Sequence, residues 1–250
     1  MLRGADSLAS RFSPVVGATR SWGDRGSRDF TVIVDNLMNL ELLFWASKHG
    51  GDPAWYGMAL SHALRTMRDH VRRDGSTFHL VDYDPGTGRM TRKRTRQGYA
   101  RGSTWSRGQA WAVYGFTMAY RESGDRRLLD AAQRTADWFI AHLPSDSVPF
   151  WDFDAPGIPN APRDSSAAAI AASGLLELAA LEPDAARSAR YSGAADSIIA
   201  SLSSAPYLAR GIFGDGYETL SAGRRLVSGP CRVAAGRCRD IELPGCSRQV

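Results

Sequence analysis

Residues 165–203 read SSAAAIAASGLLELAALEPDAARSARYSGAADSIIASLS, and this stretch decides the fold. Its first half, up to Leu181, is almost free of charge and has apolar side chains at helical spacing. Its second half, from Ala185, mixes apolar residues with Arg, Ser and Asp. Between them stands Glu182-Pro183-Asp184, in which Pro ends one helix and Asp can cap the next. The stretch therefore predicts a helical hairpin with one buried and one amphipathic helix.

The same pattern occurs twice more along the chain. Short turns of the same kind, Gly50-Gly51-Asp52-Pro53 and Ser123-Gly124-Asp125, join two earlier pairs in which the first helix is again the more apolar. We expect an all-α protein in which an outer amphipathic ring wraps an inner ring of buried helices, as in a toroid of repeated hairpins. Three hairpins form only an arc of such a toroid. The six predicted helices run roughly over residues 36–48, 53–72, 104–121, 125–142, 165–181 and 185–203.

Two long connections separate the pairs, over residues 75–103 and 144–164. Residues 77–84 in the first connection predict a short strand that ends in the turn Pro85-Gly86-Thr87-Gly88. The second connection contains the segment Phe150–Pro156, which is too aromatic for a solvated linker. Loops of this length in a compact domain are usually functional, so we expect site residues in both.

Composition and charge exclude several classes of protein. The 250 residues are 43% hydrophobic and 23% charged, which is typical of one globular domain. The net charge of +5 is concentrated in residues 219–250, which hold six Arg against Asp240 and Glu242. Because the rest of the chain is almost neutral, a nucleic-acid partner is not expected. An apolar run of membrane-spanning length and a signal peptide are both lacking, which predicts a cytoplasmic protein without a membrane partner.

Residues 219–250 also hold all three cysteines, Cys231, Cys238 and Cys246, at spacings that match no zinc signature. Helical periodicity stops in this segment. We interpret it as an atypical tail, disordered or translated in a shifted reading frame, after a helical domain of residues 1–218. The histidines do not recur at ligand spacing and no Gly-rich phosphate loop is present, so neither a metal nor a cofactor is expected.

Asp35 is the first candidate for chemistry. It follows the apolar run Thr31–Val34 and precedes the helical segment Asn36–Ala46. Burial among such neighbours raises the pKa of a carboxyl group toward neutrality, where one group can give and then take a proton. The alternative is an ordinary helix N-cap, since Asp at such a junction can accept a hydrogen bond from the first turn.

The segment Trp105–Trp111 offers a binding surface. Trp105 and Gln109 lie one helical turn apart, with Arg107 near the helix start. A guanidinium there can bind a carboxylate, and aromatic faces stack on sugar rings. The alternative is an aromatic core helix that holds a structural Arg–Asp pair.

Three polar residues outside that segment have less context. His79 lies in the predicted strand, where a packed and hydrogen-bonded histidine is the alternative to a catalytic one. Gln97 lies in a loop, and spacing alone assigns it no function. Asp164 predicts the N-cap of the helix that begins at Ser165.

Several segments together resemble one family. They are DNLMNLELLFWA (35–46), QGYA (97–100), STWSRGQAW (103–111), PFWDFDAP (149–156) and PRDSSAAAIAASGLLEL (162–178). In this order they resemble the unsaturated glucuronyl hydrolases, glycoside hydrolase family 88, over roughly residues 5–213. The resemblance implies part of a six-hairpin (α/α)6 toroid with a sugar pocket at one end. It also implies a substrate class: oligosaccharides with a 4,5-unsaturated uronic acid at the non-reducing end, made by polysaccharide lyases.

The resemblance also implies roles for individual residues. Asp35 would be the general acid and base that hydrates the C4=C5 enol ether. His79, Gln97 and Arg107 would surround the uronic acid. The aromatic walls of the site would be Trp105, Trp111 and Trp22.

The chain departs from the family pattern in three places. A second essential aspartate should precede Asp35 by more than the 34 residues present, and the atypical tail replaces the last helices with a substrate-contacting serine. Arg96 stands where His is expected. We therefore expect a partial chain, with a catalytically dead uronide-binding protein as an alternative function. An unsaturated rhamnogalacturonyl hydrolase is a further alternative, although the run Asn36-Leu37-Met38-Asn39 favours the glucuronyl family.

Overall fold

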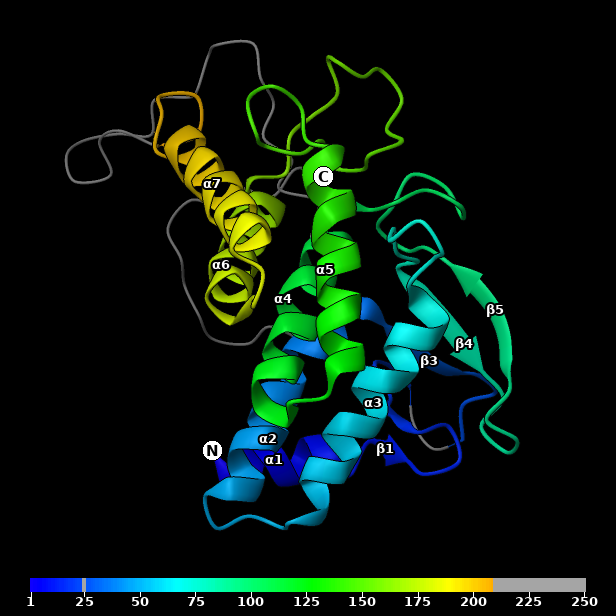
Figure 1. Ribbon diagram of the computed structural model, residues 1–250. Coiled ribbons are helices and arrows are strands. Elements are labelled where there is room, and N and C mark those ends of the chain that lie inside the picture. Colours follow the sequence, from blue (N-terminus) through cyan, green and yellow to red (C-terminus); the bar gives the residue numbers. More distant parts are fainter. Residues whose placement is uncertain (24–25, 209–250) are drawn as a thin grey trace, which may run out of the picture.

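The computed structural model describes residues 1–23 and 26–208, and three helical hairpins dominate it (Figure 1). The predicted atypical tail and the end of the predicted domain at residue 218 lie outside the described residues. The hairpins pair α2 with α3, α4 with α5 and α6 with α7. The bounds of these helices are α2 Leu40–Lys48, α3 Ala54–His70, α4 Ser106–Ser123, α5 Arg126–Ala141, α6 Ser165–Leu181 and α7 Ala185–Leu202.

The chemistry predicted for the hairpin turns is confirmed in the second and third hairpins, whereas in the first the N-cap position of α3 is Pro53 and no side chain caps that helix. Gly124 ends α4 in the left-handed region, with φ of 70°, and Asp125 caps α5 by accepting from the N–H of Arg127. Asp184 caps α7 in the same way. In the first turn the carboxylate of Asp52 accepts from the N–H of Ala54, 2.8 Å away.

The inner helix α4 packs against both α2 and α6, while α3, α5 and α7 lie outside these three helices. Glycine permits the closest approaches. A Cβ on Gly115 of α4 would lie 2.3 Å from Cβ of Leu37, and one on Gly174 of α6 would lie 2.8 Å from the Cα of Tyr114. Arg121 of α4 ties the inner helices together through ion pairs with Glu41 of α2 and Glu177 of α6.

Helix α1, Leu2–Ala9, was not predicted. It is short and contains a glycine, and it buries Ala5 and Ala9 against the main core. The predicted helix 36–48 also differs from the structure, because residues Val34–Asn39 form a 3₁₀ helix, η1, and the α-helix begins only at Leu40.

A small antiparallel sheet lies beside α3 (Figure 1). Its order is β3 (Phe30–Ile33), β4 (Leu80–Tyr83) and β5 (Met90–Arg94), so the predicted strand at 77–84 is present but shorter. A separate two-stranded ribbon joins β1 (Phe12–Ser13) to β2 (Ala18–Thr19). Within the described residues, no helix is both long enough and apolar enough to span a bilayer.

Candidate active site

The register of the sheet brings Asp35 and His79 together. Ile33 at the end of β3 pairs with Leu80 at the start of β4, and the next N–H, that of Val34, donates to the carbonyl of His79 at 3.0 Å. The chain turns into η1 directly after this bond, which directs Asp35 toward the imidazole. Residues 44 positions apart in sequence therefore become neighbours through one step of a strand ladder.

Asp35 is not a helix N-cap, and that alternative is wrong. The N-cap position of η1 is Ile33, and no side chain caps it. The Oδ2 atom of Asp35 is buried and accepts no hydrogen bond. It faces Nε2 of His79 at 3.8 Å, a separation too long for a hydrogen bond, and Nε2 is also without a partner.

Burial sets the protonation of this pair. It raises the pKa of Asp35 to about 6, against the opposing pull of a hydrogen bond from its own backbone N–H and of the charge on Arg107. Burial also lowers the pKa of His79 to about 3, assisted by the electrostatic interaction with the His70 ring and by the charges of Arg96 and Arg94. Near neutral pH the pair is therefore a carboxyl group that titrates close to neutrality beside an uncharged imidazole.

Hydrogen bonds fix which nitrogen of His79 carries its proton. The backbone N–H of Arg96 donates to Nδ1 at 3.3 Å, and the N–H of Gln97 does so at 3.5 Å. Since Nδ1 accepts, the proton of the neutral ring must be on Nε2. Nε2–H thus points toward Asp35 as a donor. The packed and hydrogen-bonded interpretation of His79 holds for one ring nitrogen and not for the other.

Trp105 and Arg107 place the start of α4 against this pair. The ring of Trp105 packs on that of His79 with centroids 4.5 Å apart, and the guanidinium of Arg107 lies 5.2 Å from the Trp105 ring centre. Arg107 also donates twice to Oδ2 of Asp164, at 2.9 and 3.1 Å. Asp164 is the predicted N-cap of α6, which is confirmed, so the predicted Arg–Asp pair joins the starts of two inner helices.

The loop that carries Gln97 is held in place by two residues for which the sequence predicted no role. Thr95 Oγ1 accepts from the N–H of Gly98 at 2.8 Å and lies 3.2 Å from Nδ1 of His79. The buried carboxylate of Asp152 accepts from the N–H of Tyr99 at 2.8 Å. A threonine one position after a strand and an aspartate in an aromatic loop give no local signal of this pairing, since the partners are far apart in sequence.

The other predicted residues lie at different depths. Trp22 is 38% exposed, bridges to Thr31 of β3, and has the guanidinium of Arg96 5.3 Å over its ring. Trp111 lies one turn beyond Arg107 on α4, and its ring packs edge-on against Tyr114.

Gln109 is structural: its buried amide donates to the carbonyls of Gly75 and Thr135.

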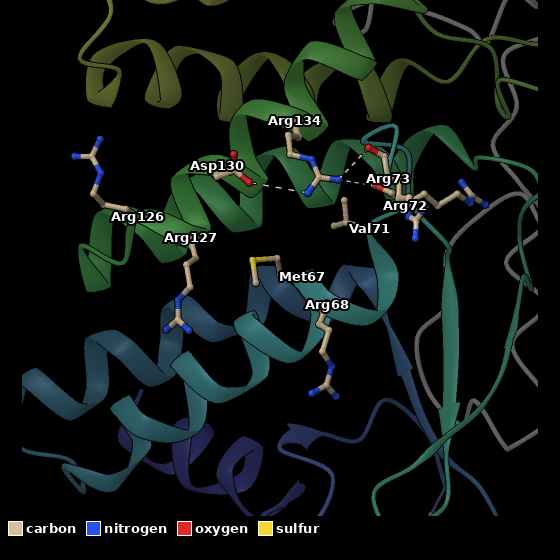
Figure 2. A pocket seen from close by; sticks show the side chains of 9 residues that line it. All are labelled: Met67, Arg68, Val71, Arg72, Arg73, Arg126, Arg127, Asp130 and Arg134. Carbon is tan, nitrogen blue, oxygen red and sulfur yellow. Dashed lines mark hydrogen bonds and ion pairs between the residues drawn. The ribbon is translucent and has the colours of Figure 1, made fainter.

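A groove of about 610 Å³ between α3 and α5 contains none of the predicted site residues (Figure 2). Most of its guanidinium groups already bind backbone carbonyls or carboxylates of the protein itself. Arg134 donates to the backbone carbonyls of Arg72 and Arg73, and Arg68 pairs with Asp69. Its lining consists of Met67, Arg68, Val71, Arg72, Arg73, Arg126, Arg127, Asp130 and Arg134.

Comparison with known proteins bears on the identity of the chain. It is 46% identical over 181 residues to an unsaturated glucuronyl hydrolase of Formosa agariphila, and 44% identical over 180 residues to one of Bacillus sp. (strain GL1). These alignments cover 71% of this chain and 45% and 48% of the two relatives. The crystal structure of the Bacillus sp. GL1 enzyme matches with a TM-score of 0.77 and 42% identity, over 80% of this chain and 54% of that one. No family model matches.

Over its matched part, the chain is similar to unsaturated glucuronyl hydrolases in both sequence and fold. The predicted fold class is confirmed with it: the three hairpins are part of the (α/α)6 toroid of unsaturated glucuronyl hydrolases. A crystal structure of an unsaturated glucuronyl hydrolase specific for heparin matches with a TM-score of 0.78 and 43% identity, over 82% of this chain and 55% of that one. The chain spans about half the length of the unsaturated glucuronyl hydrolases that it matches.

Proposed function

We propose that this protein is a hydrolase that releases the 4,5-unsaturated uronic acid from the non-reducing end of lyase-generated oligosaccharides. The bond broken is the glycosidic bond, and the chemical event is hydration of the C4=C5 enol ether. Support comes from the matched relatives and from a solved structure of a similar unsaturated glucuronyl hydrolase, with a TM-score of 0.77, that contains the saccharide dGlcA-Glc-Rha-Glc. The names of the matched relatives favour this function over a rhamnogalacturonyl hydrolase.

The observation that carries the proposal is the state of Asp35. Its pKa of about 6 leaves both the acid and the carboxylate populated near neutral pH, so one group can serve in both directions. Its buried Oδ2 is without a hydrogen-bond partner and faces a fixed N–H donor. A single carboxyl group of this kind suits addition to a double bond, whereas glycosidases that act on a saturated sugar need two.

The proposed reaction begins with proton transfer from Asp35 to the double bond. The carboxylic acid of Asp35 donates its proton to C4, and the π electrons of C4=C5 form the new C–H bond. Positive charge develops at C5 and is shared with the ring oxygen. Water adds to C5 while the Asp35 carboxylate takes one of its protons. The hemiketal that results opens by breaking the bond between C5 and the ring oxygen, which leaves a ketone at C5 and a hemiacetal at C1. The hemiacetal then collapses to an aldehyde, which breaks the glycosidic C1–O bond and expels the rest of the saccharide as an alcohol.

The surrounding residues are assigned supporting roles. His79 stays neutral because of its lowered pKa, so its Nε2–H orients a substrate oxygen or the attacking water without protonating it. Arg107 and Gln97 bind the uronic acid, and Arg107 supplies positive charge opposite its carboxylate. Trp105, Trp22 and Trp111 provide apolar faces for the sugar rings.

The test is turnover of an unsaturated chondroitin or heparin disaccharide, followed as loss of the absorbance of its conjugated enol ether. If the unmodified chain turns over the disaccharide, Asp35→Asn should lose at least 100-fold in kcat, because the amide can neither donate nor accept the proton. Asp130→Asn is the matched control, since Asp130 is an exposed carboxylate on α5.

Equal rates for Asp35→Asn and the unmodified chain would refute the role of Asp35. Binding of the disaccharide in calorimetry, with no turnover by the unmodified chain, would instead identify the uronide-binding alternative.

A further inference from the structure

Residues 89–101, RMTRKRTRQGYAR, hold six basic side chains and no acidic one, and they run along β5 into the loop beside His79. Most of this charge is used within the fold. Arg92 and Arg94 each donate to the buried carboxylate of Asp82 at 2.6 Å. Arg101 donates to the backbone carbonyl of Lys93. These contacts hold the edge of the sheet and leave little charge available for a ligand.

Arg96 differs from the other members of the run. Its side chain is exposed and lies over the ring of Trp22, and among the described residues it has no carboxylate partner. Its backbone N–H donates to His79, so the residue is fixed next to the candidate active site. Its charge also contributes to the lowered pKa of His79, which places the guanidinium within electrostatic range of that ring.

The depth of the neighbouring side chains indicates what Arg96 can reach. The side chains of Asp35 and His79 are 13% and 1% exposed, whereas Trp22 is 38% exposed. The ring that reacts with Asp35 must enter to the depth of that carboxyl group. A cation that lies over an exposed indole at the rim can then meet only the next sugar, and a sulfate ester is one anionic group that such a sugar can carry.

We propose that Arg96 is a specificity-determining residue that binds a sulfate ester on the sugar adjacent to the unsaturated uronic acid. This inference rests on the proposed function. A guanidinium stacked on an aromatic ring keeps its N–H edge free and in plane, which allows two parallel hydrogen bonds to sulfate oxygens. The indole also holds the side chain in place before the ligand arrives, which lowers the entropy cost of binding.

The experiment compares kcat/KM for a monosulfated and an unsulfated unsaturated disaccharide in three proteins: the unmodified chain, Arg96→Gln and Arg89→Gln. Arg89 is the matched control, because it is exposed and belongs to the same basic run at the far end of β5. We expect Arg96→Gln to lose about tenfold on the sulfated substrate and to keep its rate on the unsulfated one. Arg89→Gln should keep the original ratio, and Arg96→Lys should restore only part of it.

Two outcomes overturn the inference: an equal loss on both substrates, or an unchanged ratio in Arg96→Gln. Failure of the proposed function is a separate result, in which the unmodified chain turns over neither disaccharide. In that case calorimetry with the sulfated disaccharide decides, since Arg96→Gln should still weaken its binding about tenfold relative to Arg89→Gln. Equal affinities of these two variants would overturn the inference there as well.

Discussion

At the scale of single residues, the contrast between Asp35 and Asp82 shows what burial does to a carboxyl group. Asp82 is fully buried, but it accepts from Thr31, Arg92 and Arg94, and its pKa lies below the usual range. Asp35 has no such donors on Oδ2, and its pKa rises. Arg107 is the cation that lowers it, and Arg107 shares its charge with Asp164. Hydrogen-bond donors therefore separate a structural carboxylate from a proton donor in this protein.

The pH dependence of turnover should follow the protonation state of Asp35. Its acid form starts the reaction, so kcat/KM should fall about tenfold per pH unit above pH 6. Arg107→Gln removes a charge that lowers the pKa of Asp35 and frees the negative charge of Asp164, and both effects raise that pKa. The falling limb of the profile should therefore move to higher pH in Arg107→Gln. An unmoved limb would show that another group limits the rate.

At the scale of elements, the close contact between α4 and η1 decides where Asp35 lies. Leu37 of η1 packs into the space left by Gly115, two residues after Asp35 in the same 3₁₀ turn. A side chain at position 115 would push η1 outward, and Asp35 would move with it. The glycine thus links the packing of an inner helix to the position of the carboxyl group.

Gly115→Ala should lower the free energy of unfolding by about 1–3 kcal/mol, because its methyl group overlaps Leu37. Gly57→Ala is the matched control at an exposed position of α3, where an added Cβ meets nothing within 4 Å, and it should stabilise the helix by about 0.5–1 kcal/mol. Urea unfolding of both variants measures the difference. If the two variants shift the midpoint in the same direction, the contact does not limit the approach of η1 to α4.

The elements were the most predictable part of this chain. Five of the six predicted helices both begin and end within about two residues of their observed bounds, because Gly, Pro and Asp in the turns act locally. The exception is the helix predicted over residues 36–48, directly after Asp35, of which only Leu40–Lys48 is α-helical. Its first turn is a 3₁₀ helix where the chain leaves β3. The hydrogen bond from Val34 to His79, a residue distant in sequence, fixes that junction. The N-cap interpretation failed for this reason.

The resemblance placed Asp35, His79, Gln97, Trp105 and Arg107 in one site, and the structure brings these residues together. Periodicity and spacing alone could not do so, because each pairing crosses between elements. The same limit explains why no role was predicted for Thr95 and Asp152, as their partners belong to other loops.

At the scale of the whole molecule, buried neutral histidines link stability to pH. His62 accepts from the N–H of Thr19 and His70 donates to the carbonyl of Val32, so both fasten α3 to neighbouring strands. Burial lowers their pKa values to about 3 and about 4, and that of His79 to about 3. Below pH 6.5 these three histidines are protonated in the unfolded chain but stay neutral in the folded chain. The folded state therefore loses stability as pH falls.

Acid should therefore destabilise the protein well before ordinary carboxylates titrate. Each histidine contributes about 1.4 kcal/mol per pH unit, and Asp35, with its raised pKa, offsets one of them between pH 6 and 4. The expected slope is about 3 kcal/mol per pH unit between pH 6 and 5, measured by urea unfolding. His62→Gln should reduce this slope by about 1.4 kcal/mol per pH unit, which is the contribution of one proton. A stability that is flat over this range would contradict the neutral state of these rings.

The hydrogen bond from Val34 to His79 has a consequence for how the chain tolerates changes in length. The segment between Asp35 and His79, which contains all of α2 and α3, behaves toward the site as one long closed loop. Closing a longer loop costs little, about 0.6 kcal/mol for each doubling of its length. Insertions in the α2–α3 turn should therefore leave the distance between the carboxyl group and the imidazole unchanged. A single residue added between Ile33 and Asp35 would instead rotate the carboxyl group away from its partner.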